Sequence, residues 1–148
     1  MVKQLHTRSV HIDAPVKKVF AYVKDPHHFF DAFDEEWRRH MAVVEVNSTP
    51  KQVGSTFRLM GRMFLFFHME WVMTREEYVP NERIVDHAST GGVWTFTFEP
   101  DETGTTLTGS FGWSSKVPFV GELMDRVGWD GDHDLDLMLA NLKKGIET

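Results

Sequence analysis

The sequence has no cysteine, no long apolar run and no motif typical of phosphate or nucleophile chemistry. Without cysteine there can be no disulfide bonds, thiolate chemistry or cysteine-ligated zinc or iron–sulfur clusters. A membrane-spanning helix needs roughly 18 consecutive apolar residues, and the N-terminal MVKQLHTRS lacks the apolar segment of a secretory signal. We therefore expect a cytoplasmic protein. Neither a glycine-rich phosphate loop nor a G-x-S-x-G nucleophile elbow occurs.

Positive charge is scarce, because 16 lysines and arginines stand against 22 aspartates and glutamates, for a formal net charge of −6. Nucleic-acid binding favours a basic face, so we expect no nucleic-acid partner. The eight histidines include no H-x-x-x-H spacing, and we expect neither a metal ion nor another cofactor. With 148 residues, 41% of them hydrophobic, the chain can bury one core. We expect a single domain over residues 1–148.

The first third of the chain predicts one strand and two short helices. Residues 5–12 form the strand, in which Val10 and Ile12 share a face. The first helix spans residues 16–24 and ends at Asp25-Pro26, since a residue before proline avoids the α conformation. The second helix, residues 27–33, contains Phe29, Phe30 and Phe33.

From Trp37 onward the apolar period changes to two, which is typical of strands. The clearest alternation is at residues 93–98, where Trp94, Phe96 and Phe98 face one way and two threonines face the other. This pattern predicts an antiparallel sheet with one solvated face. The expected strands are residues 37–46, 54–60, a long strand ending at Val79, 83–88, 93–98 and 105–114.

The stretch Val117–Glu147 predicts a long helix opened by Pro118. Its apolar stripe has the spacing of one helical face: Val120, Met124, Val127, Leu135, Met138, Leu142 and Ile146. Gly131 lies in mid-stripe with Gly128 nearby, and each glycine costs a helix about 1 kcal/mol relative to alanine. These glycines indicate either room for a ligand beside the core face or a kink or close helix–sheet contact. Under the ligand interpretation, Gly131→Leu would block binding and leave the fold intact.

The order of elements predicts an α+β fold, a seven-stranded antiparallel sheet wrapped around the long C-terminal helix with two short helices after the first strand. Four phrases then resemble the START-like superfamily, also called SRPBCC or helix-grip, and within it the polyketide cyclase/dehydrase branch: Ile12-Asp-Ala-Pro-Val16, Val53-Gly-Ser-Thr56, Tyr78-Val-Pro-Asn-Glu-Arg-Ile84 and Trp94-Thr-Phe-Thr-Phe-Glu-Pro100 with Gly104-Thr-Thr-Leu107. The resemblance covers nearly the whole chain. It implies a cavity between sheet and helix that holds lipids, quinones, polyketides or similar molecules, and only some members are enzymes. Shared fold does not transfer chemistry.

Strand alternation predicts which side chains face that cavity. They are aromatic or flexible apolar groups suited to stacking on flat ligands, unless they simply pack on one another as a core. The expected ligand-binding residues are Phe57, Leu59, Trp71, Met73, Trp94, Phe96, Phe98, Phe111, Trp113, Val127, Gly131, Leu135 and Met138, and Leu107 shares their face.

Two charged residues are weak candidates for catalysis. Arg75 continues the parity of Trp71 and Met73, so its guanidinium would face the cavity and stabilise a carboxylate or enolate. The alternative is that a bulge near Glu76-Glu77 turns Arg75 to solvent. Asp134 lies on the shoulder of the helix stripe and would reach Arg75 or a ligand hydroxyl, or else belong to a solvated flank.

Three functions remain open from the sequence. The first is binding or transport of a hydrophobic small molecule with little or no catalysis, and the second is a polyketide aromatase/cyclase-like enzyme. The third is a surface-acting interaction module with transient membrane or protein contact through Met63–Phe67, which is apolar on both parities. The sequence does not determine the oligomeric state.

Overall fold

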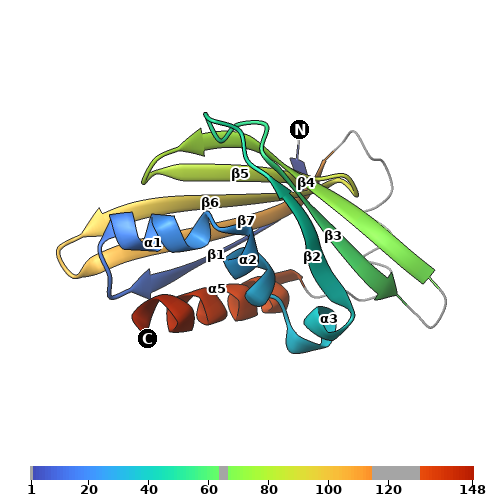
Figure 1. Cartoon of the computed structure of the whole chain (residues 1–148). Coiled ribbons are helices and arrows are strands. Elements are labelled where there is room, and N and C mark those ends of the chain that lie inside the picture. Colours follow the sequence, from blue (N-terminus) through green and yellow to red (C-terminus); the bar gives the residue numbers. More distant parts are fainter. Residues whose placement is uncertain (1, 64–66, 115–130) are drawn as a thin grey trace.

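A computed structural model describes residues 2–63, 67–114 and 131–148. Seven strands form one sheet in the order β1-β7-β6-β5-β4-β3-β2, and every neighbouring pair is antiparallel. The sheet is curved, and the helices lie on its concave side (Figure 1). The predicted fold class is confirmed. The strands are β1 Val2–Ile12, β2 Met41–Asn47, β3 Thr56–Met63, β4 Phe67–Val79, β5 Arg83–Ala88, β6 Gly92–Asp101 and β7 Gly104–Ser114.

Three short helices connect β1 to β2: α1 Val16–Val23, α2 Pro26–Asp31 and α3 Glu35–Arg39. The first two confirm the two predicted helices. The third was missed, and the strand predicted from Trp37 was wrong over its first four residues, since β2 begins at Met41. Glu35 and Arg39 form an i,i+4 ion pair on α3, and the Arg38 side chain donates to the Phe33 carbonyl. Such local polar contacts favour a helical turn.

A bulge in β4 sets which side chains face the helices. Arg75 pairs with Asp86 of β5, and Glu77 pairs with Val85, so Glu76 is the extra residue. Both glutamates are exposed, whereas Arg75 before them and Tyr78 after them point inward. The bulge therefore keeps Arg75 inside and returns Tyr78 to the core. The alternative in which this bulge turns Arg75 to solvent is wrong.

The described part of the C-terminal helix, α5, spans Gly131–Glu147. Its buried residues confirm the predicted stripe over this range and add one leucine: Gly131, Leu135, Met138, Leu139, Leu142 and Ile146. The start of the predicted helix, with Val120, Met124, Val127 and Gly128, lies outside the described residues.

α5 packs directly on β7 at Gly109. A Cβ atom there would lie 3.2 Å from Leu139 Cδ2, 3.3 Å from Leu135 Cδ1 and 3.4 Å from Phe96 Cε1. These distances are shorter than most contacts of a real Cβ atom, so helix and sheet are tightly packed at this point. The sequence offered a close helix–sheet contact as one explanation of Gly131 in the helix. The structure shows such a contact at Gly109, which lies in the strand β7. Whether Gly131 leaves room for a ligand stays a prediction.

Polar side chains fix α5 along the edge strand β1. Asp132 accepts from His6 at 3.0 Å and lies 3.4 Å from Arg8, which also pairs with Asp136. At the other end of the helix, Glu147 accepts from the Asp13 amide at 2.9 Å.

Within the described residues, no helix is long and apolar enough to cross a membrane.

Candidate functional site

One line of side chains crosses the concave face through four strands. The register pairs Phe111 with Trp94, Trp94 with Asp86, and Asp86 with Arg75. Because cross-strand partners in an antiparallel sheet project on the same side, these residues form a row beneath the helices. The row combines two aromatic rings with two opposite charges.

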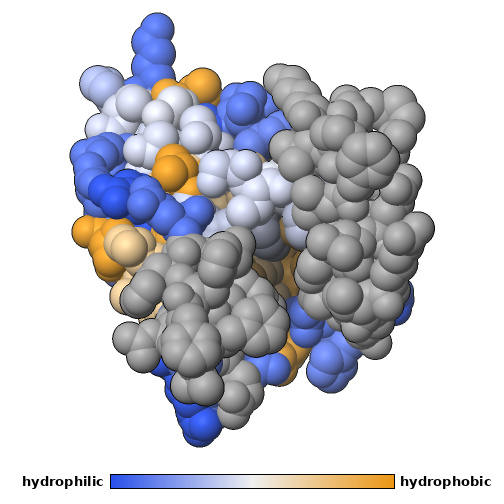
Figure 2. Space-filling model, turned by 90° about the vertical axis from the view of Figure 1, so that its right-hand side faces the viewer, coloured by the Kyte–Doolittle hydropathy of each residue, from blue (hydrophilic) through white to orange (hydrophobic). Residues whose placement is uncertain are grey.

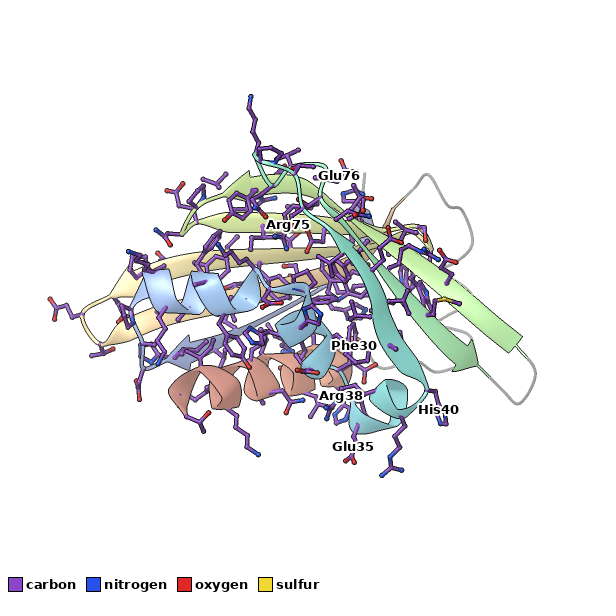
Figure 3. The ribbon with its side chains drawn as sticks, in the orientation of Figure 1. Phe30, Glu35, Arg38, His40, Arg75 and Glu76 are labelled. Atoms are coloured by element: carbon purple, nitrogen blue, oxygen red, sulfur yellow. The ribbon has the colours of Figure 1, made fainter. Side chains whose placement is uncertain are left out.

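The charges form a buried ion pair. Arg75 Nε donates to Asp86 Oδ1 at 3.0 Å, and Arg75 Nη2 donates to Asp86 Oδ2 at 3.2 Å. The two residues are only 7% and 3% exposed. Nη2 also donates to the Lys24 carbonyl at the end of α1, at 3.1 Å, and the guanidinium carbon lies 5.7 Å from the centre of the Tyr78 ring. Figure 3 marks Arg75 on β4 beside Glu76.

This pairing settles what Arg75 binds in the structure. The carboxylate beside it is that of Asp86; Asp134 is half-buried on α5, and its catalytic role stays a prediction. Burial raises the pKa of the Asp86 carboxyl above its usual value, while the hydrogen bonds and positive charge of Arg75 oppose that rise. The bidentate geometry neutralises both charges within the apolar interior.

A second feature is the aromatic rings of the concave face, whose contacts form two groups. At one end, Phe20 of α1 meets Tyr78 at 5.3 Å and Phe98 at 5.1 Å between ring centres. Phe20 and Phe98 are buried together with Ile12, Ile84 and Leu107. We call this set the closed end, because α1 fills it.

At the other end, the rings are only partly covered. Trp94 lies 4.5 Å from Phe111, which lies 5.1 Å from Trp113, and Trp94 also meets Phe33 at 6.4 Å. Trp94, Trp113 and Phe33 are half-buried, and so is Trp71, which shares the inner face of β4 with Met73 and Arg75. We call these four residues the tryptophan end. Figure 2 views the molecule from the right of Figure 1, where β4 begins, and its coloured part shows small apolar areas among polar ones.

The predicted ligand-binding residues thus separate into two groups. Trp71, Trp94 and Trp113 are half-buried at the tryptophan end, and Val127 lies outside the described residues. The others are buried: Phe57, Leu59, Met73, Phe96, Phe98, Phe111, Gly131, Leu135 and Met138. Burial is what both a packed core and a closed ligand chamber would produce, so their role stays a prediction.

Sequence reasoning missed three residues of this region. Asp86 shares the parity of Ile84 and Ala88, and this signal was present in the sequence. Phe29 of α2 and Phe33, which follows the end of that helix, are four residues apart, and their rings meet at 5.1 Å. Nothing in the local sequence shows that Phe29 reaches across to β3 and β6.

Outside the concave face, the structure was searched for other pockets and for metal-binding clusters of side chains. An open groove of about 590 Å³ runs between β1 and α5, with Ser9, Val10, Leu139 and Lys143 among its lining residues. Over the part of the chain that the structure describes, no three His, Asp or Glu side chains are grouped to hold a metal ion.

A curved antiparallel sheet closed by a C-terminal helix, with an aromatic concave face, defines the helix-grip class. The chain belongs to the family described as polyketide cyclase / dehydrase and lipid transport, whose sequence pattern it matches over residues 4–147. Comparison with proteins of curated function gave no match.

Solved structures support the same fold. A protein from Chromobacterium violaceum is 19% identical, with a TM-score of 0.63 over 98% of this chain and 99% of that one. The KanY protein, determined by NMR, is 16% identical with a TM-score of 0.70 and full coverage of both chains. The di-domain ARO/CYC BexL of the BE-7585A biosynthetic pathway is 19% identical with a TM-score of 0.67. That match covers 97% of this chain and 50% of BexL.

Proposed function

We propose that the protein binds a hydrophobic small molecule with a planar ring system at the tryptophan end. The observation that carries this proposal is the half-buried state of Trp71, Trp94 and Trp113, in contrast to the fully packed closed end. Large aromatic side chains left partly uncovered on a concave face gain free energy when a ligand covers them. Membership in a family that includes lipid transport supports the same function.

The expected chemistry is stacking and apolar burial. Aromatic pairs contribute about 0.5–1.5 kcal/mol beyond the area that they bury, so three indoles would favour flat, fused rings over branched alkanes. The binding region lies toward the Gly131 end of α5, because Leu135 and Leu139 already contact Gly109 farther along the helix. We retain the cytoplasm as the expected location.

Isothermal titration calorimetry with 2-naphthol tests the proposal. Trp94→Leu removes the ring that joins Phe33 to Phe111 and is expected to weaken binding about tenfold, since roughly 1.4 kcal/mol of ring contact is lost. Phe98→Leu removes a ring at the closed end as the matched control and should leave the affinity unchanged once folding is verified. Absence of binding to the wild type, or equal loss in both variants, would contradict the proposal.

A second candidate is a cyclase-like enzyme that folds a poly-carbonyl chain against the sheet. The specific observation in its favour is the position of the Arg75–Asp86 pair in the same cross-strand row as Trp94, together with the similarity to the ARO/CYC protein BexL. Arg75 would polarise a carbonyl from this position. The test is turnover of a poly-β-ketone probe by the double variant Arg75→Met/Asp86→Leu. Turnover at the wild-type rate would show that the pair has no part in the mechanism.

The surface-acting function through Met63–Phe67 stays a prediction. Residues 64–66 and the side chains beside them lie outside the described residues.

A further inference from the structure

Phe29 of α2 contacts both buried and half-buried rings of the concave face. Its ring lies 6.0 Å from Phe57 and 6.2 Å from Phe96, both of which are buried. It also lies 5.6 Å from Trp94 and 5.1 Å from Phe33, both half-buried. Phe29 itself is 3% exposed. One buried ring therefore contacts both the packed core and the tryptophan end.

Polar contacts from other elements hold the short helix that contains Phe29. Arg75 of β4 donates to the Lys24 carbonyl just before α2, and Asn141 of α5 donates to the Ala32 carbonyl just after it, at 3.0 Å. The Asp25 carboxylate caps the helix by accepting from the His27 amide at 2.9 Å. A six-residue helix is not stable alone, so these contacts fix the position of Phe29.

We propose that Phe29 is a specificity-determining residue that limits how far a ring system enters from the tryptophan end. The inference rests on the proposed function. A ligand stacked on Trp94 meets the edge of the Phe29 ring, which is perpendicular to Trp94 at 90°. On its other side the Phe29 ring contacts the apolar rings of Phe57 and Phe96, so shortening residue 29 opens space for one further apolar ring. The native ligand class is then a compact fused-ring molecule rather than an elongated one.

The test compares 2-naphthol, with two fused rings, and 2-anthrol, with three, by isothermal titration calorimetry. We define the selectivity as the Kd for 2-anthrol divided by the Kd for 2-naphthol. Phe29→Ala is expected to lower this ratio about tenfold, since the third ring gains apolar burial. Phe29→Leu should lower it by a smaller factor.

Phe30→Ala is the matched control, because Phe30 is the adjacent ring on the same helix, is half-buried and takes part in none of the ring contacts found over the described residues (Figure 3). The ratio should stay unchanged in this variant. Thermal unfolding verifies that each variant is folded, and Phe29→Leu carries the test if Phe29→Ala unfolds.

The outcomes separate the two proposals. If the wild type binds neither probe, the proposed function fails and the inference falls with it. If the wild type binds 2-naphthol but the ratio is the same in both Phe29 variants, or changes equally in Phe30→Ala, Phe29 does not set the depth and only the inference is overturned.

Discussion

At the scale of single residues, the Arg75–Asp86 pair is the main departure from an apolar core. Removing two charges from water costs several kcal/mol per ion, and mutual attraction offsets this only with good geometry. Here both carboxylate oxygens accept from the same guanidinium, and Lys24 supplies a third acceptor. The two charges are therefore stable in the interior only together. Replacing one of them by a neutral residue leaves the other buried without a partner.

Breaking the pair and replacing it should have opposite effects on stability. Arg75→Met leaves a buried carboxylate without its partner and is expected to lower the free energy of unfolding by about 3–5 kcal/mol. Arg75→Met/Asp86→Leu removes both charges and should recover most of that loss. Urea unfolding monitored by tryptophan fluorescence measures both. A double variant no more stable than the single one would show that the pair stabilises the fold beyond mutual compensation.

The pH dependence of Arg75→Met follows from the raised pKa of Asp86. Without the opposing charge of Arg75, the folded-state pKa rises further above the unfolded value of about 3.9. The folded state then binds the proton more tightly, so stability decreases as the pH rises through the folded-state pKa. The stability deficit of Arg75→Met should thus shrink as the pH falls from 7 toward 4. A constant deficit over this range would mean that Asp86 is not left buried and charged.

At the scale of elements, the contact of α5 with β7 depends on a residue without a side chain. Gly109→Ala would place a methyl group against Leu135, Leu139 and Phe96 at 3.2 to 3.4 Å. Such overpacking costs about 1–3 kcal/mol, and the midpoint of urea unfolding should fall accordingly. Unchanged or increased stability would show that α5 moves away from the sheet without loss.

Also at this scale, the sequence predicted most of the elements but not where they end. Period-two alternation located β6 and β7 because every second residue there faces a core. It failed at β2, where Trp37 continues an apolar pattern that belongs to α3, and it did not foresee how the β4 bulge acts. A bulge exchanges the inward-facing and outward-facing positions of all residues after it. The sequence Arg75-Glu-Glu does not show whether the bulge lies before or after Arg75, so it does not determine which way Arg75 faces.

At the scale of the whole molecule, the candidate site depends on contacts that are distant in sequence. Phe29 meets residues of β3 and β6, and Arg75 meets the end of α1, although these elements are far apart along the chain. Local patterns do not encode such partners, so Phe29 and Asp86 were missed, whereas the inward orientation of the apolar strand residues was predicted. The tryptophans were predicted because alternation alone assigns their face.

The proposed function requires that a ligand bind at the tryptophan end and not at the closed end of the concave face. Titration of the uniformly ¹⁵N-labelled protein with 2-naphthol, followed through the indole N–H and backbone amide resonances, distinguishes the two ends. We expect saturable shifts of the Trp71, Trp94 and Trp113 indoles and little change at the amides of Phe98 and Leu107. Shifts confined to the β1–α5 groove, at Ser9 and Lys143, or no saturable shift at all, would contradict it.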